Sequence, residues 1–415
     1  MSHFLLLNLM VSLIFTVLYL HKLVYLVVPL VKKEAPDTTP QRLNRFAVLI
    51  AARNEAAVIT QLIDSIRQQD YPSHLIEIFV VSDNSTDNTA ALARAAGAQV
   101  YERFNTTQKG KGYALNFLIQ TLFNTYGQDR FDGYFVFDAD NLLAPSYVHE
   151  MNHCFNQGYP VLTSLRNSKN FGDNWLSAGY AQWFLYESAF VNRSRMLLGT
   201  GAAISGTGFL MHKDVVVQHQ GWDCYLLTED IEFSVTCALN GHTIGYCHQA
   251  VFYDEQPTHW RQSWHQRMRW TKGFYQVFFR YGTRLARQAV TKRDFWAFDL
   301  FTKIFPAGAI SSLMLVTNGL MVWVSPQPLV YLRLLGTVML SSYVLQLLLM
   351  LFTTRSQWAQ IHSSPWRKIG YIATFPLFVL SFIPISLAAL FLPVQWKPIT
   401  HTRARSIHDM LSSPS

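Results

Sequence analysis

Charged residues are scarce in this chain of 415 residues, because Asp, Glu, Lys and Arg together make up only 14% of it. Ordinary soluble domains contain roughly 25% charged residues. Hydrophobic residues account for 50% of the chain, so the composition favours a membrane protein. The formal net charge is +8, but the basic residues lie beside apolar segments and form no continuous stripe, which argues against nucleic-acid binding.

Cysteine and the motifs that depend on it are also rare. The chain has four cysteines, none of them in the CxxC spacing of a zinc ribbon or a redox pair: Cys154, Cys224, Cys237 and Cys247. We expect them to be reduced thiols in a cytosolic domain.

The stretch QKGKGYALN, residues 108–116, lacks the full GxxxxGK[ST] pattern, so a phosphate-binding P-loop is not supported. We find no internal repeat and no long low-complexity tract.

Long apolar runs at both ends of the chain predict membrane helices, for which about 20 residues suffice. Residues 4–31 form the first run, and Lys32 and Lys33 behind it place the following domain on the cytoplasmic side. Three more runs follow at residues 307–324, 329–352 and 371–392. The sequence therefore predicts a multi-pass plasma-membrane protein with an N-terminal span in residues 1–33, interface helices in 281–306, about three spans in 307–395 and a tail in 396–415.

The side of the membrane on which the tail lies is left open. Strict alternation of three spans places it outside, whereas its basic residues favour the inside. Pro376 and Pro384 allow a broken or re-entrant last segment.

Residues 45–280 read as a cytosolic α/β domain. Apolar runs bounded by turn residues predict buried, mainly parallel strands at residues 46–52, 76–82 and 134–140. Helical patterns at residues 55–69 and 88–97 alternate with them, which indicates an open α/β sheet. Ligands of such sheets bind at the carboxyl ends of the strands, where the stretches RNE, DNSTD and DAD fall.

Acidic side chains at two of these strand ends are candidate ligand residues. Asp138 and Asp140 in VFDADN lie on the same side of an extended chain, so both can hold Mg²⁺ or Mn²⁺ together with substrate phosphates. A lone DxD often only starts a turn. Asp83 can accept hydrogen bonds from a base or a ribose, while Ser85 to Asp87 are suited to cap the next helix.

Two further stretches carry candidate groups. Lys111, between glycines, is placed to meet a phosphate. Glu229 and Asp230 in LLTEDIEF stand where a helix begins, a position at which the helix dipole alone favours acidic residues. If that helix points into a sugar-binding cavity, Asp230 is suited to take a proton from an attacking hydroxyl group.

The ordered set RNEA, SDNSTD, DAD, TED and QRMRW, flanked by membrane helices, resembles the membrane-integrated family-two glycosyltransferases, which include cellulose, hyaluronan, chitin and poly-N-acetylglucosamine synthases. The resemblance implies a GT-A fold, a UDP-sugar donor, a divalent cation (Mg²⁺ or Mn²⁺) and inversion at the anomeric carbon. It implies Asp230 as the catalytic base, with Glu229 and Arg269 beside it, and the metal on Asp138 and Asp140.

The resemblance also assigns the binding residues. For the UDP-sugar they are Ala52, Glu55, Asp83, Lys111, Asp138, Ala139, Asp140, Gln266, Arg267, Arg269 and Trp270. For the acceptor they are Gly206, Thr207, Gly208, Asp230 and Trp270. Arginines here can stabilise the departing diphosphate, and an indole face suits a sugar ring. A basic interface helix anchored by Trp260, Trp264 and Trp270 is the alternative for this stretch.

The leading functional prediction is a processive synthase that makes a β-linked exopolysaccharide or capsule glycan from UDP-glucose or UDP-N-acetylglucosamine and exports it through its own helices. The alternative is a non-processive enzyme that glycosylates a lipid such as ceramide or diacylglycerol. A non-catalytic membrane protein is disfavoured by the intact aspartates and QRMRW. The partners are the sugar donor, the growing glycan and membrane lipid; the sugar, its linkage and the oligomeric state are left open.

Overall fold

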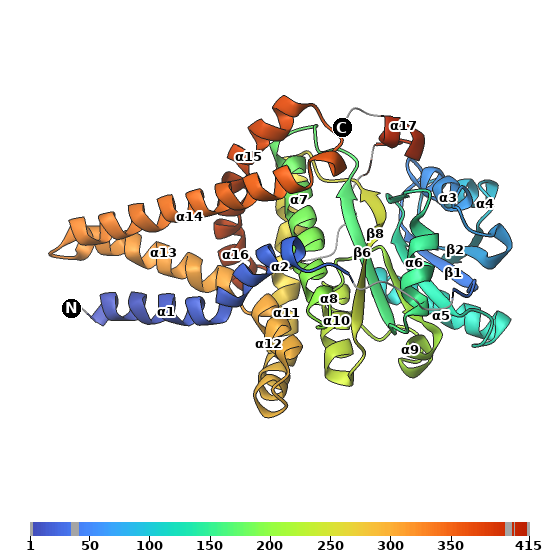
Figure 1. Cartoon of the computed structure of the whole chain (residues 1–415), viewed down its shortest axis with the longest axis horizontal. Helices are drawn as coiled ribbons and strands as arrows, with labels where there is room; N and C mark the ends of the chain where they lie inside the picture. The colour runs from blue at the N-terminus through green and yellow to red at the C-terminus, as the bar shows by residue number, and fades with distance from the viewer. Residues whose placement is uncertain (1–2, 35–40, 395–400, 402, 413–415) are drawn as a thin grey trace.

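A computed structural model describes residues 3–34, 41–394, 401 and 403–412. Figure 1 shows an α/β domain on one side and long helices that project away from it on the other. Four helical segments are long and apolar enough to cross a membrane: His3–Val31, Ala307–Val324, Pro328–Ser356 and Pro365–Phe391. The predicted number of apolar segments is thus found among the described residues.

The α/β domain is organised around one mixed, mainly parallel sheet of eight strands in the order β3-β2-β1-β4-β7-β6-β8-β5. The strands are β1 Phe46–Ala52, β2 Ile76–Asp83, β3 Gln99–Arg103, β4 Gly133–Asp138, β5 Leu142–Leu143, β6 Val161–Ser168, β7 Phe209–His212 and β8 Ile244–Asp254. Strand β1 runs parallel to both β2 and β4, whereas β7 is antiparallel to β4 and β6. The predicted fold class is confirmed.

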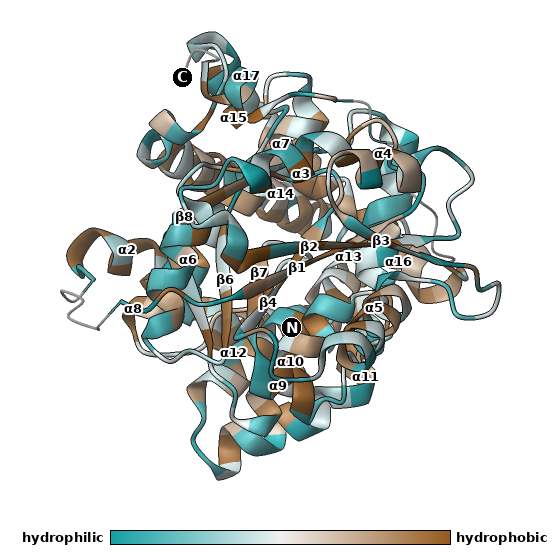
Figure 2. Ribbon diagram, turned by 90° about the vertical axis from the view of Figure 1, so that its right-hand side faces the viewer, coloured by the Kyte–Doolittle hydropathy of each residue, from teal (hydrophilic) through white to brown (hydrophobic). Residues whose placement is uncertain are grey.

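Helices cover both faces of this sheet, which explains why its central strands are continuous apolar runs. One face packs against α3 Ile59–Arg67, α4 Thr89–Ala95 and α6 Tyr147–Asn156. The other packs against α5 Lys111–Tyr126, α9 Lys213–Gln218 and α10 Glu229–Asn240. In Figure 2 the strands β1 and β2 form a brown, apolar layer between these two groups of helices.

A helical layer joins the domain to the membrane segments. It contains α7 Trp175–Tyr186, a π-helix over Glu187–Asn192, α8 Arg193–Leu197, α11 Trp260–Thr291 and α12 Phe295–Ile304. Because α11 is one unbroken helix, the domain boundary predicted at residue 280 falls inside it. Trp296, Leu300 and Ile304 of α12 belong to the same apolar core as the sheet, so this helix is packed on the domain.

The apolar helices differ in how far they leave the domain. The N-terminal segment comprises α1 His3–Tyr19, a 3₁₀ turn Leu20–Leu23 and α2 Val24–Val31, and α13 Ala307–Val324 and α14 Pro328–Ser356 follow α12. Helices α1, α13 and α14 project away from the sheet (Figure 1). The side-chain amides of Asn8 and Asn318 exchange hydrogen bonds of 3.1 and 2.8 Å, which tie α1 to α13.

The last apolar segment stays against the domain. It consists of α15 Pro365–Leu380 and α16 Phe382–Phe391, which break at Ser381. The Asn167 side chain donates a 2.7 Å hydrogen bond to the Gln360 carbonyl in the loop before α15. At the far end, the Lys272 ammonium group donates a 3.0 Å hydrogen bond to the Ala389 carbonyl. The segment therefore begins and ends beside the α/β domain, which fits the broken form allowed by its prolines.

The described part of the tail folds back onto the same domain. Helix α17 Ile407–Ser412 packs Ile407 and Met410 against Leu142 and Tyr253 of the sheet. If the apolar helices cross a membrane, this part of the tail lies on the same side as the α/β domain, as its basic residues favour. Tail residues 396–400, 402 and 413–415 lie outside the described residues.

Candidate active site

The carboxyl ends of the parallel strands meet at one edge of the sheet. Ala51 of β1 pairs with Asp138 of β4, and Ala52 pairs with Ser82 of β2. These three strands therefore end side by side, and the polar residues that follow them lie at the same edge of the sheet. A cavity of about 370 Å³ opens at this edge and continues toward α7, α11 and α16. This is the position at which an open α/β sheet binds its ligands.

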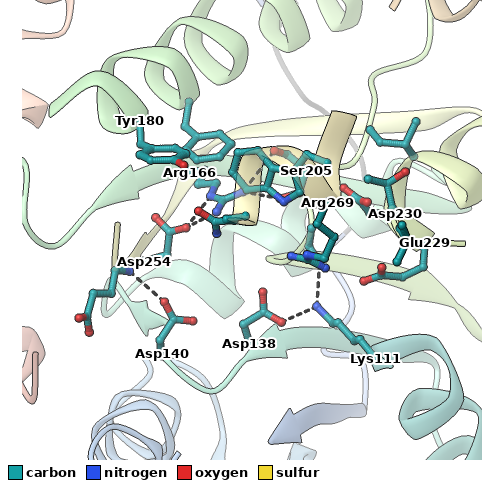
Figure 3. Close-up of a pocket in the computed structure, with 18 of the residues that line it drawn as sticks. Lys111, Asp138, Asp140, Arg166, Tyr180, Ser205, Glu229, Asp230, Asp254 and Arg269 are labelled. Carbon is teal, nitrogen blue, oxygen red and sulfur yellow. Dashed lines mark hydrogen bonds and ion pairs between the residues drawn. The ribbon is translucent and has the colours of Figure 1, made fainter. Parts of the chain in front are cut away.

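Most of the predicted site residues line this single cavity. They are Ala52, Glu55, Asp83, Lys111, Asp138, Ala139, Asp140, Gly206, Glu229, Asp230, Gln266, Arg269 and Trp270. Figure 3 shows Asp138 facing Lys111, with Arg269 above them and Glu229 and Asp230 beside Arg269. Arg267, Thr207 and Gly208 are not among the lining residues.

A lysine that is itself bound to a loop carbonyl holds the first aspartate of DAD. The Lys111 ammonium group lies 2.5 Å from the Asp138 carboxylate and donates a 2.8 Å hydrogen bond to the Gly206 carbonyl. The Asp138 backbone N–H donates to the Thr207 hydroxyl at 2.8 Å. Thr207 thus fixes the end of β4 and does not itself line the cavity, and its contact with the acceptor stays a prediction.

Gly208 supports the fold of the same loop. Its φ is +66°, and a Cβ atom there would lie 2.2 Å from the Phe252 ring, so only glycine fits. Its N–H donates a 3.0 Å hydrogen bond to the Val136 carbonyl. The predicted acceptor stretch therefore reaches the cavity through Ser205 and Gly206 alone.

Asp83 reaches the cavity wall while bound to a buried arginine. Its Oδ1 atom accepts from the Arg103 guanidinium at 2.5 Å and from the Asn84 side chain at 3.0 Å. Both Asp83 and Arg103 are buried, so the pair fixes the carboxylate at the end of β2. The Oδ2 atom stays without a partner among the described residues and can accept from a ligand.

Glu229 and Asp230 face the cavity from the first turn of α10. Burial raises the pKa of Glu229 to about 7, and the neighbouring charge of Asp230 adds to the rise, while Lys111 and Arg269 oppose it. Burial also raises the pKa of Asp230, against the pull of Lys111, Lys303 and Arg269. A carboxylate with a raised pKa is a stronger base near neutral pH than an exposed one.

One face of α11 supplies the polar residues of QRMRW. Gln266, Arg269 and Trp270 are spaced i, i+3 and i+4, which puts them on the same side of the helix, and all three line the cavity. The Gln266 Oε1 atom is buried without a hydrogen-bond partner among the described residues. Arg269 likewise makes no ion pair within the described chain, so its guanidinium is available to a ligand.

The Arg267 side chain does not point into the cavity, because Arg267 lies outside the face of α11 that lines it. Its side chain is fully buried, and its Nη1 atom donates to the Ser381 hydroxyl at 2.5 Å and to the Phe378 carbonyl at 3.3 Å. The guanidinium carbon lies 4.9 and 4.8 Å from the ring centroids of Phe378 and Phe382. Arg267 thus holds the break between α15 and α16 and does not line the cavity, and its contact with the diphosphate stays a prediction.

Several lining residues were not predicted from the sequence. Asp254 ends β8 and accepts a 2.7 Å hydrogen bond from Nε of Arg166, whose Nη1 atom donates to the Ser205 carbonyl at 2.7 Å. The Glu255 backbone N–H donates to Asp140 at 2.9 Å. The stretch AVFYDEQ carries the same signal as VFDAD, an apolar strand that ends in acidic residues, and could have indicated this pair.

His401 enters the cavity from the tail. Its Nδ1 atom lies 2.9 Å from the Glu55 carboxylate, and its Nε2 atom lies 3.8 Å from Asp140. Burial opposes a charge on the ring, but Asp140, Glu55 and Glu255 outweigh burial and raise the pKa of His401 to about 10. No local pattern in the sequence connects residue 401 with a strand end about 260 residues earlier.

The acidic groups fit a hard divalent cation shared with a substrate. Asp138 and Asp140 provide oxygen ligands at one end of β4, which suit Mg²⁺ or Mn²⁺. No cluster of three or more His, Cys, Asp and Glu side chains among the described residues is arranged to hold a metal by itself. Two carboxylates that depend on substrate phosphates for the remaining ligands match the way Mg²⁺ is commonly bound.

A mixed, mainly parallel sheet with acidic residues at its carboxyl edge is the GT-A-like architecture of glycosyltransferases. A mannosyltransferase from Pyrobaculum calidifontis, solved in complex with GDP-Man and Mn²⁺, has a similar fold, with a TM-score of 0.57 at 16% identity. That likeness covers 92% of this chain and 98% of the mannosyltransferase.

Residues 42–273, more than half of the chain, match the family described as Glycosyltransferase like family 2, and the chain belongs to this family. The relatives include a probable glycosyltransferase of Bacillus subtilis, 27% identical over 64% of this chain and 63% of the relative. A beta-monoglucosyldiacylglycerol synthase of Synechocystis is 26% identical over 68% of this chain and 61% of the relative. A poly-beta-1,6-N-acetyl-D-glucosamine synthase of Staphylococcus aureus is 28% identical over 59% and 58%, respectively. The chain thus matches less than two thirds of each relative's length.

Proposed function

We propose that the chain transfers a hexose from a UDP-sugar, with inversion at the anomeric carbon, to a hydroxyl group of a membrane-anchored acceptor. The observation that carries the proposal is one cavity in which Asp138, Asp230 and Arg269 meet beside the membrane helices. The identity of the nucleotide rests on the resemblance of the motifs that supply these residues.

The residues that bind the sugar donor lie at the strand ends and on α11. Asp83 accepts a hydrogen bond from the nucleoside, and Lys111 and Arg269 bind the diphosphate. A divalent cation on Asp138 and Asp140 would neutralise charge on the diphosphate. Because Arg269 has no ion-pair partner in the described chain, its charge is free to stabilise the departing phosphate oxygen.

Asp230 is the residue that acts on the acceptor. Its carboxylate takes the proton from the acceptor hydroxyl as that oxygen attacks the anomeric carbon, and the raised pKa makes it an adequate base near neutral pH. The bond from the sugar to the donor phosphate breaks as the new glycosidic bond forms. A single displacement of this kind inverts the anomeric configuration.

The wall of the cavity favours an acceptor that arrives from the membrane surface. Among the four candidate spans, only the last contributes described lining residues, Phe378 and Phe382. Helices α1, α13 and α14 contribute none. An enclosed route through these helices, as export of a polymer requires, stays a prediction, whereas Trp183, 43% exposed at the cavity rim, suits contact with lipid.

Polymerisation is the second candidate, favoured by the aromatic surroundings of Trp270. Its ring lies 5.6 Å from the ring of Tyr180 and 6.0 Å from that of Phe184, all three lining the cavity. Aromatic faces of this kind can support the sugar rings of a growing chain.

Product analysis tests the function and separates its two forms. Purified protein in lipid nanodiscs is incubated with Mn²⁺ and a panel of radiolabelled UDP-sugars. We expect one UDP-sugar to yield a short lipid-soluble product, seen as a single chromatographic spot. A ladder or high-mass polymer would establish the second candidate, and no transfer from any UDP-sugar would overturn the proposal.

Removing a metal carboxylate tests the proposed cation site. Asp140→Ala should abolish the increase in UDP affinity that Mn²⁺ produces in the wild type, because one of two protein ligands is lost. Isothermal titration of UDP with and without Mn²⁺ measures this. Equal effects of Mn²⁺ on the variant and the wild type would contradict the site.

A further inference from the structure

An ion pair lies in the cavity wall beyond the residues assigned to the donor. Glu187, at the end of α7, pairs with Lys303 of α12, and both residues line the cavity. The side chains are only 11% and 16% exposed. Lys303 also lines the cavity with Asp230 and is close enough to lower the pKa of Asp230, so the pair lies near the proposed base.

Local helix geometry directs Glu187 into the cavity. Tyr180, Trp183, Phe184 and Glu187 are spaced i, i+3, i+4 and i+7 and line the cavity together. The α-helix changes to a π-helix at Glu187, and π segments often occur at functional sites. The carboxylate is therefore presented at the end of an aromatic wall.

The neighbouring ion pair shows what a purely structural pair looks like here. Arg195 and Asp299 lie 2.6 Å apart, each side chain is 1% exposed, and neither lines the cavity. Asp299 lies four residues before Lys303 and therefore on the same side of α12, but only Lys303 lines the cavity. Glu187 and Lys303 keep polar atoms directed to the cavity, and an ion pair in a wall adds little stability by itself.

The chemistry of the pair matches hydroxyl groups. An ammonium group has three donors and a carboxylate has four lone-pair sites, so the contact between Lys303 and Oε1 of Glu187 leaves most of this capacity unused among the described residues. A neighbouring aromatic wall binds the apolar face of a sugar ring. An acceptor with one hydroxyl group, such as diacylglycerol, would use it at Asp230 and leave the pair facing ester and acyl groups.

We propose that Glu187 and Lys303 form an acceptor subsite that binds the ring hydroxyl groups of a carbohydrate, so that the acceptor is a sugar and not a simple lipid alcohol. The sugar is either the headgroup of a glycolipid or the end of a growing glycan, the acceptors of the two candidate functions, which share this chemistry. The inference rests on the proposed function, since it places this subsite next to the base of that reaction.

Transfer assays in nanodiscs compare three acceptors: glucosyl-diacylglycerol, a cello- or chito-disaccharide, and diacylglycerol. We expect the wild type to use a sugar-bearing acceptor at least tenfold more efficiently than diacylglycerol, measured as kcat/KM. Preference for the glycolipid or for the disaccharide identifies the source. Equal or better use of diacylglycerol would overturn the subsite.

Variants of the pair give the residue-level test. Glu187→Gln and Lys303→Gln should each raise the KM for the sugar acceptor at least tenfold while the KM for the UDP-sugar changes by less than about threefold. Lys303→Arg, which keeps the charge and the donors, should restore part of the loss. Lys22→Gln is the matched control. Lys22 pairs with Asp299, the carboxylate that also pairs with Arg195, and does not line the cavity, so this substitution should leave both KM values unchanged.

A binding arm separates failure of the subsite from failure of the function. Equilibrium dialysis of labelled cello- and chito-disaccharides against the UDP-loaded protein should show binding that Glu187→Gln weakens at least tenfold and Lys22→Gln does not. Such binding without any transfer by the wild type would overturn the proposed function and keep the subsite. Transfer whose acceptor KM is unaffected by both variants would overturn the subsite and keep the function.

Discussion

Glu229 and Asp230 are adjacent carboxylates that cannot ionise independently. Each lies in the first turn of α10, inside the cavity, and burial raises both pKa values. Like charges disfavour each other, so the ionisation of one raises the pKa of the other. Lys111 and Arg269 counteract this effect and keep a negative charge available in the site. For Asp230 the cause of the raised pKa is burial, and this supports its proposed role as the base.

The first prediction concerns pH. The base is lost as pH falls through its pKa, so kcat/KM should fall on the acid side with a midpoint above the ordinary carboxyl range of about 4. Burial raises the pKa of Asp230, whereas the charge of Asp230 raises the pKa of Glu229, so Glu229→Gln should leave this midpoint nearly unchanged. A pH profile of kcat/KM checks both, and loss of the acid limb in Glu229→Gln would show that Glu229 and not Asp230 is the titrating base.

At the scale of elements, α11 separates two arginines that the sequence places together. Arg269 lies on the face that lines the cavity, whereas Arg267 lies between Phe378 and Phe382 at the break of the last apolar segment. The same helix therefore serves the site with one face and the membrane-side packing with another.

These two arginines give the second prediction as a matched pair. Arg269→Ala should lower kcat by about 10²–10³-fold, since it removes charge from the departing diphosphate, and leave the unfolding temperature unchanged. Arg267→Ala should instead destabilise the protein by about 3 kcal/mol, because it leaves a hole among buried rings. Transfer assays and thermal unfolding distinguish the two, and the reverse pattern would contradict the assignment.

The elements that were predictable from the sequence are those with a local signal. Strand β1 has its predicted bounds, and β2 differs by one residue, because buried parallel strands are continuous apolar runs that end in polar turns. The acidic residues at those ends followed from the same signal. The direction of the Arg267 side chain depends on how α11 is rotated about its axis when it packs on its neighbours. The motif alone does not determine that rotation.

At the scale of the whole molecule, the tail returns to the sheet. Arg403 donates its backbone N–H to Glu255 at 3.0 Å, and its guanidinium lies 2.9 Å from Asp173. The Arg405 guanidinium donates to the Lys169 carbonyl at 3.0 Å. These contacts carry His401 to the strand ends, and they arise from tertiary packing between distant segments, which is why the sequence left the tail open.

The third prediction concerns membrane topology. Single cysteines at Ser356 and His408 should react with a membrane-impermeant maleimide from the same side, and a cysteine at Gln327, between α13 and α14, from the other. All four native cysteines are buried, so their background labelling should be low. Labelling in intact cells and in inverted vesicles measures this, and opposite sides for positions 356 and 408 would contradict the returning last segment.

We propose that one cavity at the carboxyl edge of the sheet performs inverting sugar transfer with Asp230 as its base. The most direct test is the anomeric configuration of the product formed from an α-linked UDP-sugar by the wild type and by Asp230→Asn in nanodiscs. We expect a β-linked product from the wild type, a loss of transfer of about 10²–10⁴-fold in the variant, and UDP binding within about threefold of normal. An α-linked product, or full turnover by Asp230→Asn, would contradict it.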